Sequence, residues 1–402
     1  MRNLLLATSA LVVAGSMFAG SAMAQNKPIS LGLGGYFNYA FGIVSQDDGL
    51  GQAANPVANQ KARDHGFLSD GEIHIRGSTT LDNGLMVGVQ VELEATTSQD
   101  QIDETYMYFR SAQFGELRVG QDDGAANQFA SIGAPSPIAR FGINAPANVF
   151  TQAPVGHRAG QNVDIEVGQF HGDAEKVTYF SPTIAGFRIG ISYTPDATET
   201  GSYTRPAGNS GTAAAGSGPT IGLANVTPLG LENQAGAQGE LWDLAGTYNQ
   251  TIQGVGISLA AGYTKGKLEI AAAGADDRTA WGLGGQLSYM GFTVGGAYRS
   301  DDQGLTGNNE LTAWTAGIQY TMGPWAVSAG YGIATVEGGV GFAGEDETKT
   351  YEIAVQYTLG PGIEVYAGLV GMEYTNNADQ ASAVALLDND TTTFFVGSRL
   401  AF

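Results

Sequence analysis

A period-two alternation of apolar and polar residues runs through most of this chain and sets the strongest limit on its fold. In the stretch GLMVGVQVELEATT, residues 84–97, the odd positions from Leu85 to Ala95 are apolar, while Glu92 and Glu94 stand at even positions. Successive side chains of a β-strand point to opposite faces, so this pattern predicts a strand with one apolar and one polar face. The preceding Asp82-Asn83-Gly84 is typical of a hairpin turn.

The same alternation predicts about sixteen strands in the whole chain. We expect them near residues 29–44, 70–81, 84–97, 102–112, 115–121, 174–181, 185–195, 239–250, 255–268, 278–289, 291–300, 310–321, 325–336, 349–359, 363–375 and 391–402. The 60 glycines oppose long helices, while 17 tyrosines and 17 phenylalanines favour strands. The expected class is therefore all-β.

The connections between these strands are alternately short and long. Short turns such as LDNGL, YMGF and TMGPW interleave with a set of longer polar segments. The long segments are residues 45–69, 122–173, 196–238, 301–309, 337–348 and 376–390. This regular sorting of turns and loops to opposite rims predicts a transmembrane antiparallel up-and-down β-barrel.

Aromatic residues near the strand ends support a membrane barrel over a secreted adhesin or lectin sandwich. Trp281 and Tyr289 bracket one apolar face, as do Trp314 and Tyr320, which predicts two interfacial girdles. The alternative is that they are core aromatics between packed sheets. Beyond residue 24, no run of about 18 apolar residues predicts a membrane helix.

The first 24 residues have the features of a secretory signal. Arg2 precedes an apolar stretch, and Ala22-Met23-Ala24 forms an A-x-A cleavage site. The alternative, a transmembrane anchor, fits poorly because small and polar residues break the apolar stretch. We expect a signal peptide over residues 1–24 and one barrel domain over residues 25–402.

Charge and cysteine content exclude several classes of protein. The formal net charge of −21 argues against nucleic acid as a partner. The chain has no cysteine, so no disulfide framework or cysteine metal site supports the fold.

The last segment, TTTFFVGSRLAF, ends in strand-like alternation. Phe394, Val396, Leu400 and Phe402 share one face, with Ser398 as the exception. A closed barrel must pair its last strand with its first, so we expect Phe402 to lie in the sheet at barrel closure.

Two longer motifs and the terminal phenylalanine resemble the general diffusion porins of Gram-negative outer membranes, most closely the sixteen-stranded type of alphaproteobacteria. The motifs are GELRVGQDDGAANQFASIGAPSP at 115–137 and KVTYFSPTIAGFRIGISYTP at 176–195. The resemblance implies an outer-membrane homotrimer whose segment after the fifth strand folds inward as a constriction loop. Residues 196–238 depart from it as an unusually long outer loop.

Strand parity places most strand arginines on the polar, lumen-facing side. These are Arg76, Arg110, Arg118, Arg188, Arg278, Arg299 and Arg399. A guanidinium on the lipid face would cost about 2–4 kcal/mol at the midplane, which favours this placement. Alternatively, they pair with wall carboxylates and stiffen the barrel. The candidate carboxylates are Glu72, Glu92, Glu94 and Glu104.

The expected constriction loop begins with Asp122 and Asp123, and Asp164, Glu166 and Asp173 follow. Facing the basic wall, they would create a transverse field that sorts polar solutes. Tyr106 and Tyr108 also fall on the lumen side, where they either pack against the loop or form a stacking surface for sugars.

We therefore expect a passive channel for ions and small hydrophilic solutes, with a substrate-specific channel for sugars or anions as the alternative. No G-x-S-x-G or H-E-x-x-H motif accompanies the four histidines, so we expect no enzyme. We expect no cofactor, although Asp47-Asp48-Gly49 and the inward-loop carboxylates could hold calcium. The acidic total favours cations and the arginines favour anions, which leaves ion selectivity open.

Overall fold

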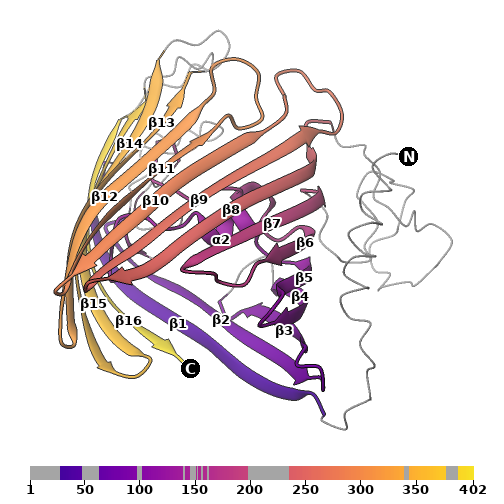
Figure 1. Cartoon of the computed structure of the whole chain (residues 1–402). Helices are drawn as coiled ribbons and strands as arrows, with labels where there is room; N and C mark the ends of the chain where they lie inside the picture. Colours follow the sequence, from indigo (N-terminus) through magenta and orange to yellow (C-terminus); the bar gives the residue numbers. More distant parts are fainter. Residues whose placement is uncertain are drawn as a thin grey trace, which may run out of the picture.

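Sixteen antiparallel strands close into a single barrel, which confirms the predicted fold class (Figure 1). The computed structural model describes residues 28–47, 63–96, 102–138, 141–144, 151, 153–154, 157–160, 163–197, 235–338, 344–376 and 388–402. Each strand pairs with its neighbours in sequence, and the last strand pairs with the first. The expected signal peptide lies outside the described residues.

The strands are close to their expected positions. They are β1 (Ser30–Ser45), β2 (His65–Thr80), β3 (Met86–Glu94), β4 (Ile102–Ser111), β5 (Gly115–Gln121), β6 (Glu175–Phe180), β7 (Phe187–Asp196), β8 (Gln238–Ile252), β9 (Val255–Leu268), β10 (Thr279–Tyr289), β11 (Phe292–Asp301), β12 (Leu311–Met322), β13 (Trp325–Glu337), β14 (Glu345–Gly360), β15 (Ile363–Asn376) and β16 (Asn389–Ala401).

Two strands begin earlier than the sequence predicts. Residues 65–69, expected in a loop, belong to β2, where Phe67 pairs with Phe41 of β1 and their rings lie 5.0 Å apart. Residues 345–348, also expected in a loop, begin β14. These polar residues are typical of a loop in sequence, but Asp346 and Thr348 are buried. Asp346 accepts a hydrogen bond from the backbone N–H of Arg158, and Thr348 donates one to the carbonyl of Gly160, both inside the barrel.

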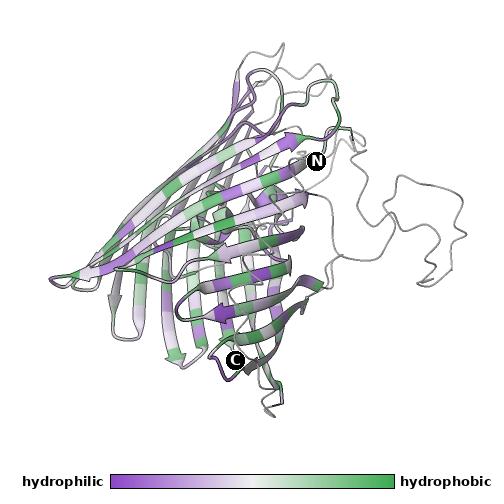
Figure 2. Cartoon of the chain, turned by 45° about the vertical axis from the view of Figure 1, so that its right-hand side comes forward, coloured by the Kyte–Doolittle hydropathy of each residue, from purple (hydrophilic) through white to green (hydrophobic). Residues whose placement is uncertain are grey.

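The alternation of the sequence becomes an alternation between the two faces of the wall. In β9, Leu259 and Tyr263 are 48% and 42% exposed on the outside, whereas Ala260 and Thr264 are buried on the inside. Apolar residues recur along the strands in Figure 2. A barrel with an apolar outer face and a polar interior fits the hydrocarbon of a membrane.

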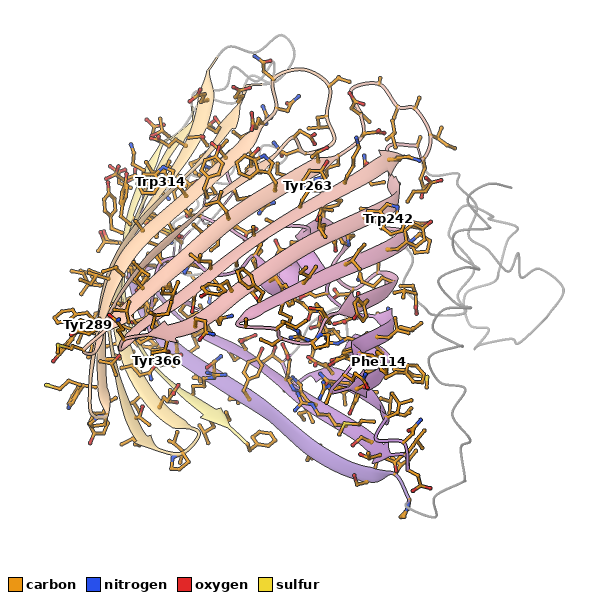
Figure 3. The ribbon with its side chains drawn as sticks, in the orientation of Figure 1. Phe114, Trp242, Tyr263, Tyr289, Trp314 and Tyr366 are labelled. Atoms are coloured by element: carbon orange, nitrogen blue, oxygen red, sulfur yellow. The ribbon has the colours of Figure 1, made fainter. Side chains whose placement is uncertain are left out.

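Aromatic side chains form two tiers on the outer face. Trp242, Tyr263 and Trp314 lie toward the rim that carries the long connections, while Phe114 and Tyr289 lie near the opposite rim (Figure 3). We call these the loop rim and the turn rim. Ring pairs in tilted contact strengthen both tiers, with the ring centres of Tyr193 and Trp242 4.8 Å apart near the loop rim, and those of Phe292 and Tyr320 4.4 Å apart near the turn rim. This is the arrangement of two interfacial girdles.

The chain terminus is held in the sheet where the barrel closes. The backbone N–H of Phe402 donates to the carbonyl of Gly35 at 3.0 Å, and the N–H of Gly35 donates to the carbonyl of Phe402 at 3.0 Å. From Tyr36 to Ser45, β1 pairs with β16 in continuous register. Closure removes both sheet edges, so these backbone groups are satisfied without water.

Among the described residues between β5 and β6 are two short helices, α2 (Ala125–Phe129) and the 3-10 helix η2 (Gln169–His171). Figure 1 shows α2 within the barrel. The first N–H of α2, from Ala125, donates to Oγ of Ser192 on β7 at 2.8 Å, so the wall satisfies a group that a helix start leaves unpaired. No helix in the described ranges has the length and hydropathy needed to cross a bilayer.

Candidate channel constriction

The segment between β5 and β6 follows the inner wall of the barrel. We call residues 122–173, as far as they are described, the inner loop. Its early part packs on β7 to β9 through α2, its middle contacts β10 to β16, and its last part returns to β8 through η2. The inward folding that the family resemblance implies is therefore present.

Glycines on the inner face of the wall make room for the inner loop. A Cβ atom on Gly190 of β7 would lie 2.9 Å from Cβ of Ala125, and one on Gly262 of β9 would lie 2.8 Å from Cβ of Ala130. On β13, a Cβ on Gly330 would lie 3.0 Å from Cδ1 of Ile143. These contacts are closer than side chains ordinarily allow, so the wall has glycine where the loop approaches it.

Lys176 on β6 ties the two ends of the inner loop together. Its ammonium donates to the backbone carbonyls of Asp122, at the start of the loop, and of Gly172, at its end. A third bond goes to the carbonyl of Ala174 at 2.7 Å. The buried charge of Lys176 is thus surrounded by backbone acceptors, and removing it would release both ends.

A buried polar group fixes the end of the loop to the wall. Nε2 of His171 lies 3.2 Å from Oδ1 of Asp243 on β8, and both side chains are almost fully buried. Thr264 on β9 donates to the same carboxylate oxygen at 2.7 Å. Gly124 at the loop start lies against this pair, where a Cβ would come within 2.8 Å of the His171 ring.

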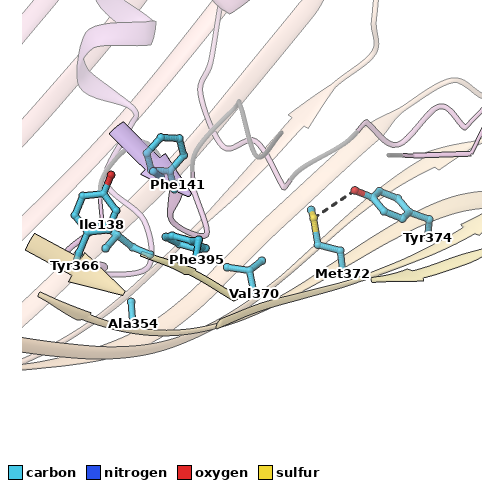
Figure 4. Packing of buried hydrophobic residues seen from close by; sticks show 9 residues of the cluster. Ile138, Phe141, Ala354, Tyr366, Val370, Met372, Tyr374 and Phe395 are labelled. Carbon is cyan, nitrogen blue, oxygen red and sulfur yellow. Dashed lines mark hydrogen bonds between the residues drawn. The ribbon is translucent and has the colours of Figure 1, made fainter. Parts of the chain in front are cut away.

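The middle of the inner loop is fixed on the opposite side of the barrel. Glu352 on β14 accepts the backbone N–H of Ile143 at 2.6 Å and the hydroxyl of Ser328 at 2.9 Å. Beside it, Ile138 and Phe141 pack into a buried cluster with wall residues (Figure 4). The wall members are Ala40, Ala354, Tyr366, Val370, Met372, Tyr374 and Phe395.

Ion pairs fix the returning part of the loop. Arg299 of β11 contacts Asp164 of the loop at 2.6 Å and Asp301 of its own strand at 2.9 Å. Arg278 also contacts Asp301, at 2.7 Å, and its guanidinium lies 3.8 Å from the ring centre of Phe170. Two of the predicted lumen arginines therefore hold the inner loop.

Other arginines form a layer near the turn rim of β4 to β7. Glu116 contacts Arg110 at 2.6 Å and Arg118 at 2.7 Å. The third guanidinium, of Arg188, lies 4.8 Å from the ring centre of Phe180, over which Arg118 also stacks at 5.1 Å. The side chain of Arg110 is 52% exposed on the inner face.

The predicted lumen tyrosines lie beneath this layer. Arg118 lies 4.8 Å over the ring of Tyr106, and Arg110 lies 5.1 Å over the ring of Tyr108. The two tyrosines are only 6% and 8% exposed. Their rings support guanidinium groups, which favours packing over a stacking surface for sugars.

Carboxylates gather closer to the loop rim. Oxygens of Glu104, Asp123 and Asp173 lie within 4.8 Å of one another. Glu72 and Glu94 form a second such group with Asp103. His74 links the wall carboxylates, with Nε2 at 2.8 Å from Glu72 and 3.3 Å from Glu92. Next to it, Arg76 donates to Gln90 at 2.8 Å.

This arrangement corrects the predicted transverse field at Asp122. The Asp122 side chain is 2% exposed and contacts Arg118 at 3.0 Å, four residues before it, so it does not face an opposite wall across water. Instead, the positive and negative side chains lie at different levels along the channel axis, with arginines near the turn rim and carboxylates nearer the loop rim. On the inner face of β4, Glu104 and Arg110 are six residues apart, roughly 20 Å along the strand at about 3.3 Å per residue.

Burial and neighbouring carboxylates alter the titration of the loop start. Burial, followed by the charges of Asp173 and Asp122, raises the pKa of Asp123 to about 7. Burial also raises the pKa of Asp122, against the opposing effect of Arg118. Asp123 is therefore a channel charge that changes near neutral pH.

The calcium prediction remains untested. Carboxylate oxygens are the ligands that calcium takes, and Glu104, Asp123 and Asp173 could supply three of them. At the other predicted location, Asp47 donates its backbone N–H to Asn389, while Asp48 and Gly49 lie outside the described residues.

Several residues that hold the inner loop were missed from sequence. Lys176, Asp243 and Glu352 are there only wall residues, because their partners in the inner loop are far away in the chain. Glu116, which joins Arg110 and Arg118 of the wall, was also missed. Period two could have placed them on the inner face. Arg399, the last predicted arginine, lies 5.6 Å from the ring centre of Tyr36, near the turn rim of β16.

Comparison with known proteins gives one consistent family. A family model described as "Gram-negative porin" matches residues 7–379. A curated protein of Rickettsia conorii, described as uncharacterized, is 21% identical over 379 residues, which cover 82% of this chain and 85% of that protein.

Solved structures share the fold at low sequence identity. The anion-selective porin from Comamonas acidovorans is 17% identical, with a TM-score of 0.59 over 93% of this chain and 100% of the other. OmpT of Vibrio cholerae, in a trimer form, is 13% identical, with a TM-score of 0.55 over 94% and 100%. A variant of the Rh. blastica porin is 16% identical, with a TM-score of 0.52 over 93% and 100%.

Proposed function

Because this chain belongs to the Gram-negative porin family and forms an outer-membrane diffusion channel, we propose that it is a general porin, which passes ions and small hydrophilic solutes passively. The inner loop sets the width of the passage. No energy source and no tight binding are required, since the solutes move down their own gradients.

The observation that carries this proposal is the placement of the inner loop. It packs on β7 to β16 and on Ala40 of β1, while the inner face of β2 to β4 keeps exposed charge at Arg76 and Arg110. Sixteen strands enclose more space than wall side chains fill, so a passage between the loop and the charged wall holds water.

A substrate-specific channel is the second candidate. A passage for sugars would favour aromatic rings open to the lumen, whereas Tyr106 and Tyr108 are covered by Arg118 and Arg110. A passage for anions would gain from the arginine layer near the turn rim, but solutes also pass the carboxylates near the loop rim. The mixed lining favours the general channel.

Orientation and assembly follow from the family. In bacterial outer-membrane barrels, short turns face the periplasm and long loops face the exterior, which places our turn rim on the periplasmic side. The trimer form of Vibrio cholerae OmpT supports a homotrimer for this chain too, with outer-membrane lipid around it. Porins are normally non-enzymatic channels, and we assign this chain no reaction and no cofactor.

A liposome-swelling assay tests general against specific passage. Liposomes containing the purified protein are diluted into neutral, zwitterionic and charged solutes of increasing size. A general channel gives rates that fall smoothly with solute size and do not saturate. A rate that saturates for one solute, or that distinguishes two stereoisomers of equal size, would instead establish the specific channel.

A further inference from the structure

A polar cleft of about 280 Å³ opens on the inner wall at the turn rim, away from the arginine layer and the carboxylate groups. Its wall comes from β12 to β16, and Ser136-Pro137 of the inner loop faces it. The wall residues that line it include Thr321, Trp325, Gln356, Thr358, Glu364 and Arg399. The volume is just under the roughly 300 Å³ at which small-molecule pockets begin, which suits a small solute.

The two charged groups of this cleft lie side by side without an ion pair. Glu364 of β15 and Arg399 of β16 are directly paired in the sheet register. Paired residues of neighbouring strands are close enough for their charges to meet. Nevertheless, neither side chain forms an ion pair within the part of the chain that the structure describes.

The guanidinium of Arg399 also has donor capacity to spare. Its Nε–H is buried and has no hydrogen-bond acceptor among the described residues. The hydroxyl of Tyr366, on β15 next to Glu364, is likewise buried without a partner. A buried polar group without a partner costs free energy, which a ligand recovers if it supplies the missing bond.

We propose that this cleft is a subsite for small zwitterions, with Arg399 binding the carboxylate and Glu364 binding the ammonium group of an α-amino acid. The hydroxyls and amides of Thr321, Gln356 and Thr358 would bind its polar side chain. A guanidinium fits a carboxylate with two parallel hydrogen bonds, which makes this end of the site specific.

The lining disfavours the other classes of solute. A simple anion meets the repulsion of Glu364, and a simple cation meets that of Arg399. The cleft offers a sugar no aromatic ring to stack on, because the ring of Trp325 belongs to the outer girdle. There it is 47% exposed and contacts Tyr357. The subsite rests on the proposed channel function, since solutes reach it through the lumen.

Saturation-transfer NMR of the detergent-solubilised, folded protein tests the subsite without requiring ion conduction. The probes are L-serine as zwitterion, glycerol as neutral solute, acetate as anion and ethylammonium as cation. We expect L-serine to bind at least about tenfold more tightly than the other three, because only it completes two charge-assisted bonds. Equal signals from L-serine and glycerol would overturn the proposal.

Variants locate the site. Arg399→Gln and Glu364→Gln should each weaken L-serine binding about tenfold, by loss of one charge-assisted hydrogen bond. Lys265→Gln, which removes a charge from the exposed outer face of β9, is the matched control and should leave binding unchanged. The double exchange Arg399→Glu with Glu364→Arg should retain binding within about threefold, since both charges remain in register.

The result separates the two proposals. Unchanged L-serine binding in Arg399→Gln and Glu364→Gln overturns the subsite, whatever the channel does. Normal ion conductance without L-serine binding leaves the channel and removes the subsite. If L-serine binds to a protein that conducts no ions, the subsite is supported and the diffusion function is refuted.

Discussion

Gly284 of β10 offers the most direct test of how the wall and the inner loop fit together. A Cβ atom at this position would overlap the carbonyl oxygen of Ile132 and lie 2.9 Å from its carbonyl carbon. Ordinary contact begins at 3.4 Å, so in Gly284→Ala the loop must move away from the wall. The strand itself cannot yield, because both its edges are paired.

The movement breaks specific bonds. Gln286 donates to the carbonyl of Gly133 at 2.9 Å, and the N–H of Ala134 donates to Thr315 at 3.2 Å. Overpacking costs about 1–3 kcal/mol and each of the two lost bonds about 0.5–1.5 kcal/mol, so we expect a total of roughly 2–6 kcal/mol. The displaced loop also narrows the passage.

Single-channel conductance and thermal unfolding check both effects. Gly284→Ala should lower the conductance and the unfolding temperature. Gly246→Ala adds the same methyl group on the outer face of β8, where the nearest atom would be 3.7 Å away, and should change neither. Wild-type conductance and stability in Gly284→Ala would refute the packing of the inner loop on β10.

Three further predictions concern the bonds that fix the inner loop. Glu352→Ala leaves the Ile143 N–H and the Ser328 hydroxyl without their acceptor, and should destabilise the loop by about 1.5–3 kcal/mol per bond. Proteolysis near residue 143 should then be faster, and unchanged proteolysis would contradict this. Lys176→Met should release both loop ends and raise the open-channel current noise. Lys349→Met, which removes a half-buried lysine that pairs with Glu347 outside this network, should not; equal noise in both variants would exclude the role of Lys176. Because the pKa of Asp123 is raised to about 7, its ionisation opposes folding, so stability is present below about pH 4 and declines as pH rises through 7. Cation preference, measured by reversal potential, should rise as the pH passes through 7, and Asp123→Asn should reduce both changes; changes of wild-type size in Asp123→Asn would assign them to another group.

The strands were predictable because each depends on local alternation. Sixteen segments, the alternating loop lengths and the final pairing through Phe402 all follow from period two and from the need to close the barrel. The early starts of β2 and β14 were missed for different reasons. Residues 65–69 join the sheet through long-range pairing, such as that of Phe67 with Phe41 of β1. In β14, polar residues such as Asp346 resemble a loop, and the burial that places them in a strand comes from the inner loop, whose Arg158 N–H donates to Asp346.

The site was less predictable because its contacts are long-range. Parity places Arg118 and Arg299 on the inner face, but only the fold brings Asp164 to Arg299 and directs Asp122 back to Arg118. Inner-face glycines such as Gly262 and Gly330 offered a signal, since a strand has few reasons to contain glycine unless backbone approaches closely. The glycine content of the chain, taken alone, indicates only that long helices are disfavoured, and does not show where the inner loop approaches the wall.

The proposed function requires the barrel to hold an open, water-filled passage beside the inner loop. Single-channel recording of the purified, folded protein in a planar bilayer tests it most directly. We predict stepwise openings, in groups of three for a trimer, with conductance proportional to the conductivity of the bathing salt. Absence of any conductance from correctly folded protein would contradict it.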